Sequence, residues 1–148
     1  MYNIIIVIII IINFERRIHL STLKYSRQRE SIKEYLNSSC EHPTADMVYM
    51  SVRQEFPNIS LGTVYRNLNL LADLGEAIKI TTPNGGDRFD GRTAPHYHFC
   101  CTKCGNVIDL DLKELTHVNE AANEHFDGII ESHSMMFYGT CSDCINNQ

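Results

Sequence analysis

The sequence predicts an α+β fold, in which an N-terminal domain of helices and a hairpin precedes a small C-terminal α/β domain. Apolar residues between positions 26 and 74 recur at the three- and four-residue spacing of amphipathic helices. Short extended runs separated by Gly and Pro follow, and two Cys-x-x-Cys pairs bracket the last part of the chain. With 148 residues, 43% of them hydrophobic, the chain can form two small domains whose modest cores would be stabilised by a metal.

Three helices are expected in the first half of the chain. The first spans residues 26–36, and the second spans residues 44–56 with Thr44 as its N-cap. The third follows the cap residue Ser60 and ends at Gly75. Their spacing directs one set of apolar side chains toward a shared core, namely Ile32, Leu36, Val48, Val52, Leu61, Val64, Leu68, Leu71 and Leu74.

A hairpin is expected after the third helix, because the pattern changes to extended runs at residues 77–82 and 87–89. The segment Pro83-Asn84-Gly85-Gly86 between these runs suits a tight turn. Three helices followed by a hairpin describe a winged helix-turn-helix domain. We assign this domain to residues 21–90 and a linker to residues 91–95.

Residues 96–148 are expected to form the second domain. Strands are predicted at residues 96–101, 107–111 and 129–138, and a helix is predicted at residues 113–126. One side of this helix is apolar, and its inward side chains would be Leu115, Val118 and Ala122.

The first 20 residues fit neither domain. The apolar run at residues 4–12 is shorter than the about 20 residues that a membrane span needs, and no basic flank or small-residue cleavage site accompanies it. We therefore interpret residues 1–20 as a disordered extension or a misassigned start, with a short membrane-associating tail as the alternative. The protein is expected to be cytoplasmic, with no membrane partner.

Charge is divided unevenly along the chain. Residues 1–94 hold 11 Lys and Arg against 10 Asp and Glu, whereas residues 95–148 hold 2 against 8. The formal net charge of −5 is thus the sum of +1 and −6, and it argues against a protein that simply coats nucleic acid. Only the first part could comfortably face phosphate groups.

The two Cys-x-x-Cys pairs predict a structural zinc site made by Cys101, Cys104, Cys141 and Cys144. Four thiolates at tetrahedral positions suit Zn²⁺ and leave no place for a substrate, and a reducing cytosol favours zinc over disulfides. The alternative is a redox protein with two reactive dithiols, although a redox Cys-x-x-Cys normally opens a helix of a thioredoxin-like unit. Cys40 and Cys100 lack a partner pattern and are interpreted as ordinary buried or half-buried thiols.

A second group of metal ligands is predicted around His96 and His98, which a strand would project to one face. Asp109 lies on the next expected strand, and Asp90 lies just before the linker. Imidazole nitrogen together with carboxylate oxygen favours iron, manganese or zinc. The histidine pair could instead be a surface coincidence, or the group could serve a zinc hydrolase, although the sequence lacks an H-E-x-x-H motif.

The outward face of the third helix is suited to the major groove of DNA, where its side chains can meet thymine methyl groups, guanine or phosphate. We assign to this interface Thr63, Tyr65, Arg66 and Asn67, with Lys24 and Arg29 from the start of the first helix. The alternatives are a solvated polar face, or a zinc-stapled protein-interaction module without a role on DNA.

Several stretches together resemble the ferric uptake regulator family. They are His42-Pro-Thr-Ala-Asp46, Thr63-Val-Tyr-Arg-Asn-Leu68, Arg88-Phe-Asp90, His96-Tyr-His98 with Cys101-x-x-Cys104-Gly, and Tyr138-Gly with Cys141-x-x-Cys144. The resemblance covers about residues 23–144. It implies a homodimer, formed by the second domain, whose winged helices bind a palindromic A/T-rich operator in double-stranded DNA when a regulatory metal clamps them. It also implies that Fe²⁺ or Mn²⁺ is bound by His42, Asp90, His96, His98 and Asp109.

Within this family the pattern looks most like the peroxide-sensing repressors, because Asp109 stands where iron-uptake regulators commonly have glutamate and Tyr97 stands between the two histidines. The resemblance implies that iron-catalysed oxidation of His42 or His96 senses peroxide, which is regulation and not enzymatic turnover. The alternative is an iron-, zinc- or manganese-uptake regulator that responds to metal supply.

A further metal site of iron-uptake members lacks support in this sequence. Pro95 and Tyr97 occupy the positions where those members have a histidine and an acidic residue, and only His133 is retained. We therefore interpret His133 as structural or as a stray ligand.

Overall fold

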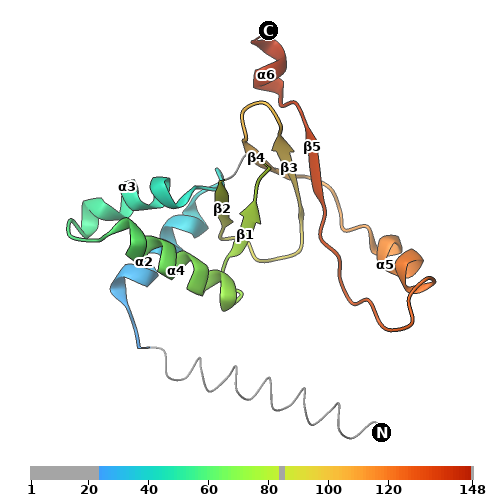
Figure 1. The fold of residues 1–148 in the computed structure, drawn as a ribbon, viewed down its shortest axis with the longest axis horizontal. Coiled ribbons are helices and arrows are strands. Elements are labelled where there is room, and N and C mark those ends of the chain that lie inside the picture. Colours follow the sequence, from blue (N-terminus) through green and yellow to red (C-terminus); the bar gives the residue numbers. More distant parts are fainter. Residues whose placement is uncertain (1–23, 84–85, 148) are drawn as a thin grey trace, which may run out of the picture.

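The first part of the chain consists of three helices and a hairpin (Figure 1). A computed structural model describes residues 24–83 and 86–147, so the expectations for residues 1–20 and for the turn residues 84–85 lie outside the described residues. The helices are α2 (Arg27–Ser38), α3 (Ala45–Glu55) and α4 (Leu61–Asp73), and the antiparallel strands are β1 (Ile78–Thr81) and β2 (Asp87–Asp90). This order confirms the predicted helices and hairpin.

α2, α3 and α4 each begin after an N-cap side chain, of which Thr44 and Ser60 were predicted and Ser26 was not. The Ser26 Oγ accepts a hydrogen bond from the Arg29 N–H, and Thr44 and Ser60 cap α3 and α4 in the same way. These bonds satisfy N–H groups that have no partner within the first helical turn. Gly75 follows α4 with a left-handed φ of 72°, which ends the helix. In the described part of the chain no helix is long and apolar enough to cross a membrane, and the run at residues 4–12 lies outside that part.

One core joins the three helices to the hairpin. Its buried side chains are Ile32, Leu36, Ala45, Val48, Val52, Ile59, Val64, Leu68, Leu71, Ala77 and Phe89. The prediction was wrong for Leu61 and Leu74, which are only half-buried because they lie at the two ends of α4. Phe89 is fully buried, so β2 is anchored to the helices and the position of the next residue, Asp90, is fixed.

A three-stranded sheet forms the second part, with β3 (Tyr97–Cys101) in its middle. β4 (Val107–Leu110) pairs with β3 antiparallel, and β5 (Met136–Gly139) pairs with it parallel on the other side. α5 (Thr116–Asn123) projects away from the sheet, and the short α6 (Ser142–Asn146), which was not predicted, follows β5 (Figure 1). Helices and sheets together confirm the α+β fold class.

The strand predicted at residues 129–138 was too long, since only its last residues pair with β3. Upstream of β5 the backbone binds side chains of α5 instead of a neighbouring strand. Asn123 both donates to the Ile130 carbonyl oxygen and accepts from its N–H, and Asn119 donates to the Glu131 carbonyl oxygen. Backbone groups satisfied in this way are not available to a sheet ladder.

The helix predicted at residues 113–126 was also too long. Leu115 has a non-helical ψ of 74°, and its N–H donates to the Tyr97 hydroxyl at 2.8 Å, so α5 begins only after it. The expected inward residues Leu115, Val118 and Ala122 are half-buried and not fully buried. Within the described part of the chain, the apolar side of α5 is therefore incompletely covered.

The hairpin also packs against the second sheet. Ile80 of β1 is buried with Cys100 and Val107 in a second, smaller core. Gly91 passes so close to the end of α2 that a Cβ atom there would lie 2.8 Å from backbone atoms of Leu36 and Asn37. Only glycine fits this approach, which brings the start of the linker against the helices.

Candidate metal centre

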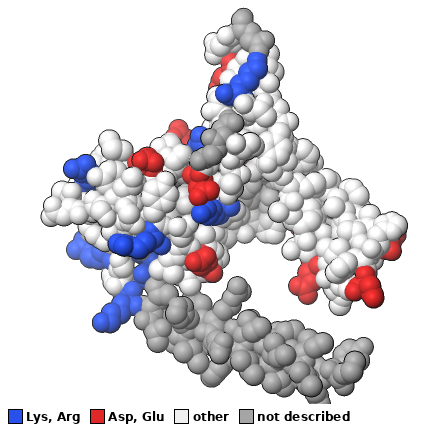
Figure 2. Space-filling model, in the orientation of Figure 1, with Lys and Arg blue, Asp and Glu red and all other residues white. Residues whose placement is uncertain are grey.

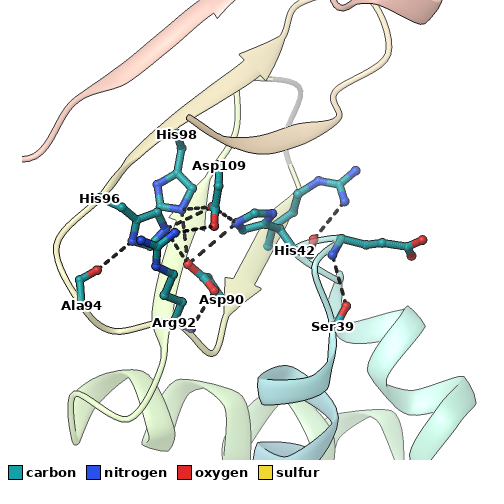
Figure 3. A network of polar contacts seen from close by, with 10 residues as sticks. Ser39, His42, Asp90, Arg92, Ala94, His96, His98 and Asp109 are labelled. Atoms are coloured by element: carbon teal, nitrogen blue, oxygen red, sulfur yellow. Dashed lines mark hydrogen bonds and ion pairs between the residues drawn. The ribbon is translucent and has the colours of Figure 1, made fainter. Parts of the chain in front are cut away.

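Four of the predicted regulatory ligands lie where the hairpin meets the second sheet. Asp90 ends β2, His96 leads from the linker into β3, and His98 lies two residues further along. Asp109 on β4 is the direct register partner of His98. Because alternate residues of a strand share one face, His96 and His98 both point toward the two carboxylates (Figure 3).

His42 reaches the same point from the segment between α2 and α3. It has a positive φ of 48°, which is uncommon for a residue other than glycine. The Arg88 guanidinium donates to the His42 carbonyl oxygen at 3.0 Å, and the Phe89 N–H donates to the Pro43 carbonyl oxygen at 3.0 Å. These bonds hold the segment against β2, and the His42 imidazole is buried at the site.

The five side chains converge closely. The His42 Nε2 lies 2.8 Å from the Asp109 Oδ1, and the His96 Nε2 lies 3.0 Å from the Asp90 Oδ2 and 3.1 Å from the Asp109 Oδ1. The His98 Nε2 lies 3.3 and 3.5 Å from the same two oxygens. One donor atom from each residue lies within 4.8 Å of all the others, so a single ion could contact the whole group.

The atoms at the centre of this group lack hydrogen-bond partners. Among the described residues, the buried atoms His42 Nε2, His96 Nε2 and Asp109 Oδ1 make no aligned hydrogen bond despite their short contacts. The His96 Nδ1–H donates to the Ala94 carbonyl oxygen at 2.7 Å, which leaves the Nε2 lone pair facing inward. Buried polar atoms without partners are costly, and a bound ion would satisfy them. Nitrogen and carboxylate donors of this kind fit Fe²⁺, Mn²⁺ or Zn²⁺.

Asp90 is held in its ionised form. Burial acts to raise its pKa, but hydrogen bonds from His98 and from the Arg92 N–H outweigh burial, with help from the charges of His42 and His96. The pKa of Asp90 therefore lies below its ordinary value. The carboxylate is the form that can bind a cation.

Two surface hollows open on the group from different sides. One of about 380 Å³ is lined by His96 and Asp109, and the other of about 410 Å³ is lined by His42, Asp90 and Asp109. Arg92 lines both hollows. A small reactant can therefore approach the site, although its histidines are almost completely buried.

The four paired cysteines form a second group at the other end of β3. Cys101 ends β3, Cys104 lies in the turn to β4, and Cys141 and Cys144 lie at the start of α6 and within it. Their sulfur atoms lie within 4.8 Å of one another. Hydrogen bonds from the N–H groups of Cys104 and Cys141 lower the pKa of Cys101 to about 6, whereas the neighbouring thiols of Cys141 and Cys104 raise the pKa of Cys144 to about 12. Four sulfur donors at this spacing fit a tetrahedral Zn²⁺.

The two remaining cysteines lie outside this group. Cys100 is fully buried in the smaller core, as expected. The expectation was wrong for Cys40, which is exposed because residues 39–41 turn across the surface after α2.

The predicted DNA-facing residues of α4 divide into two kinds. Tyr65 and Arg66 are exposed, whereas Thr63 and Asn67 are half-buried. Arg66 donates to the Thr63 Oγ1 at 3.1 Å, and the Asn67 Nδ2 donates to the Thr63 carbonyl oxygen at 2.9 Å. Thr63 and Asn67 thus support a surface from which Tyr65 and Arg66 project.

Lys24 and Arg29 meet at a separate place, the start of α2, where Arg29 donates to the Lys24 carbonyl oxygen at 2.9 Å. On the face shown in Figure 2, Lys and Arg side chains lie over the helices together with some Asp and Glu, whereas only Asp and Glu are coloured on the projection that carries α5. Residues 24–74 hold six Lys and Arg and six Asp and Glu, whereas residues 113–131 hold one and five, so the helices would repel an anionic partner less than the projection with α5 would.

Three contributors to the regulatory group were not predicted from the sequence. The Arg92 N–H donates to the Asp90 Oδ1 at 2.7 Å, and the Arg92 guanidinium lies 3.3 Å from the Asp109 Oδ2. Arg88 holds the His42 backbone, and the Ala94 carbonyl orients His96. The contacts of Arg88 with His42 and of the Arg92 guanidinium with Asp109 join distant segments, so no local sequence pattern indicates them. The other two contacts each join residues two positions apart, and they were not predicted either.

His133 belongs to a hydrogen-bonded group on the other face of β3. The Tyr97 hydroxyl donates to the His133 Nε2, and the His133 Nδ1–H donates to the Asn119 Oδ1 at 2.8 Å. Both ring nitrogens therefore have protein partners, which supports a structural role for His133.

Comparisons with known proteins point to one family. The model of the Ferric uptake regulator family matches residues 21–138. The peroxide-responsive repressor PerR of Staphylococcus epidermidis is 38% identical over 122 residues, which cover 82% of this chain and 81% of that protein. The protein of the same name from Staphylococcus aureus is 37% identical over 122 residues, which cover 82% of this chain and 82% of that protein.

Two solved structures are similar over most of their length. The ferric uptake regulator Fur of Helicobacter pylori has a TM-score of 0.75 at 27% identity, with 92% of this chain and 91% of that chain covered. The peroxide stress regulator of Campylobacter jejuni has a TM-score of 0.70 at 33% identity, with 79% of this chain and 88% of that chain covered.

Proposed function

The chain belongs to the ferric uptake regulator family, and we propose that it is a metal-dependent, DNA-binding repressor that leaves DNA when peroxide oxidises one of its histidines. Members of this family are dimeric, metal-responsive transcriptional regulators and not enzymes. The observation that carries the proposal is the convergence of one donor atom each from His42, Asp90, His96, His98 and Asp109.

Fe²⁺ or Mn²⁺ bound by this group would link the two parts of the chain. His42 precedes α3, whereas His98 and Asp109 belong to the second sheet. An ion held by all of them would restrict the orientation of the helices relative to the sheet. In a two-fold dimer the α4 helices would then meet major grooves of a palindromic A/T-rich operator with a fixed spacing.

The exposed Tyr65 and Arg66 would contact base edges in that groove, with Thr63 and Asn67 supporting them. Lys24 and Arg29 would contact phosphate groups, which position a protein on DNA without reading its sequence.

Ferrous iron at the regulatory site would supply the redox chemistry that activates hydrogen peroxide beside the imidazoles. One peroxide oxygen would become bonded to a ring carbon of His42 or His96 in place of a C–H bond, and the other would leave as water. The histidine side chain thus loses two electrons, and peroxide gains them. The Nε2 atoms of both imidazoles lie within 3.1 Å of the Asp109 Oδ1. The names of the two staphylococcal relatives support peroxide as the signal.

Zn²⁺ held by Cys101, Cys104, Cys141 and Cys144 would stabilise the second part of the chain, which would form the homodimer. The incompletely covered apolar side of α5 is consistent with a contact to a second copy. A regulator of DNA with a zinc-bound set of reduced thiols would act in the cytoplasm.

Peroxide treatment of the protein loaded with Fe²⁺ or with Mn²⁺ tests the proposal. The iron form should release operator DNA and gain one oxygen atom on the peptide that contains His42 or His96, as measured by mass spectrometry. The manganese form should stay bound. Release with oxygen only on Met or Cys would identify thioether or thiol oxidation as the switch. Neither oxidation nor release would indicate a regulator of metal supply.

A further inference from the structure

We propose that Arg92 limits each carboxylate of the regulatory site to one metal-binding oxygen and so keeps room there for a small reactant. This inference rests on the proposed function, in which the site holds Fe²⁺ or Mn²⁺. Arg92 lies in the linker between β2 and β3, and it contacts both carboxylates with different groups.

The two oxygens of each carboxylate have different surroundings (Figure 3). The Asp90 Oδ2 lies 3.0 Å from the His96 Nε2 and 3.3 Å from the His98 Nε2, whereas its Oδ1 accepts the Arg92 N–H at 2.7 Å. The Asp109 Oδ1 lies 2.8 Å from the His42 Nε2, whereas its Oδ2 lies 3.3 Å from the Arg92 guanidinium. In both residues the inner oxygen faces the imidazoles and the outer oxygen faces Arg92.

This division restricts how the carboxylates can bind a metal. A carboxylate can bind a metal through one oxygen or through both. A hydrogen bond to the outer oxygen competes with binding through both oxygens. With one oxygen each, the five residues offer five donor atoms. An octahedral ion such as Mn²⁺ would then have one position for water or peroxide, which a second oxygen of Asp109 would fill.

The position of the Arg92 side chain suits this role better than a role in stabilising the fold. Its side chain is 56% exposed and that of Asp109 is 34% exposed, and ion pairs at such exposure contribute little to the free energy of unfolding. Arg92 also lines both hollows that open on the site. Its guanidinium therefore acts where a reactant would enter.

The two contacts can be separated experimentally. The bond to Asp90 comes from the Arg92 backbone and persists when the side chain is replaced, whereas the contact with Asp109 is lost. Arg92→Ala removes the whole side chain, and Arg92→Met keeps an apolar stem of similar length. Lys113→Ala is the matched control, because Lys113 lines one of the same hollows and has no ion pair with either carboxylate among the described residues.

The experiment uses the full-length dimer loaded with Mn²⁺. Both Arg92 variants should bind Mn²⁺ at least as tightly as the wild type, but the line broadening of the Mn²⁺ electron paramagnetic resonance spectrum by ¹⁷O-water should decrease. With Fe²⁺ and peroxide, histidine oxidation should slow by about 10- to 100-fold, the usual effect of losing a group that orients a ligand. Lys113→Ala should behave as the wild type.

Two results would overturn this inference and leave the proposed function intact. Unchanged water broadening and oxidation in both Arg92 variants would show that the guanidinium does not restrict Asp109. Loss of Mn²⁺ binding in both variants would show that Arg92 supports the carboxylates and does not limit them. A wild-type protein that binds no Mn²⁺, or that leaves its histidines unoxidised, would refute the proposed function and this inference with it.

Discussion

His98 and Asp109 face each other across β3 and β4 as direct register partners, and the His98 Nε2 lies 3.5 Å from the Asp109 Oδ1. The turn that joins the same two strands carries Cys104 of the cysteine group. Both groups of candidate metal ligands are thus built on one strand pair. We expect that loss of either metal disturbs the strand pair on which the other depends.

Replacing Asp109 by Asn should weaken Mn²⁺ binding by at least about 10-fold, because a neutral amide oxygen is a poorer ligand than a carboxylate. Operator binding should then require more Mn²⁺. Titration calorimetry measures the first effect and a gel-shift series the second. Asp111→Asn removes an equal charge two residues away and outside the five-residue group, so its Mn²⁺ affinity should stay near that of the wild type. Equal losses in both variants would point to a general effect of charge.

Cys104→Ser should abolish tightly held zinc and unfold the second sheet or make the protein monomeric. Structural zinc contributes on the order of 10 kcal/mol to folds of this kind. Native mass spectrometry reports both the zinc content and the oligomeric state. Cys40→Ser is the control, since Cys40 is exposed and outside the cysteine group. A stable, zinc-replete dimer without Cys104 would contradict the assignment.

Tyr65→Ala and Arg66→Ala should each weaken operator binding by roughly 1–3 kcal/mol without changing the metal content, as expected for contacts in the major groove. Fluorescence anisotropy at fixed salt measures this change. Tyr65→Phe keeps the aromatic ring and should bind almost as the wild type does. Operator affinity that is unchanged in both alanine variants would exclude α4 as the reading helix.

Phe89→Ala should lower the free energy of unfolding by about 3–5 kcal/mol, the usual cost of a large cavity in a core. Phe89 is 0% exposed, and its loss also frees Asp90 to move, so Mn²⁺ affinity should fall as well. Urea unfolding and Mn²⁺ titration test the two effects. Met50→Ala, at a side chain 66% exposed on α3, should change stability by less than about 0.5 kcal/mol. A small effect of Phe89→Ala would contradict its role as the anchor of β2.

Most members of the two groups of candidate metal ligands could be predicted, because residue types and short spacings already suggest them. The two Cys-x-x-Cys pairs predict a metal site through their spacing, whereas the spacing of His96 and His98 left a surface coincidence open until the family resemblance was added. His42 was expected only from the resemblance, since its place in the group depends on a positive φ and on a bond from the distant Arg88. Arg92 was not expected at all, because its backbone and side chain meet two carboxylates on different strands.

Local sequence was sufficient to predict the three helices, the caps of α3 and α4 and the apolar faces that form the first core, because helical periodicity and N-capping are local properties of the backbone. The lengths of β5 and α5 depended on tertiary contacts, since Asn119 and Asn123 bind backbone that would otherwise extend the sheet. Tertiary packing also brought donor atoms from four separate segments within 4.8 Å of one another. Such contacts depend on how distant segments pack, and the spacing of residues along the chain does not predict that packing.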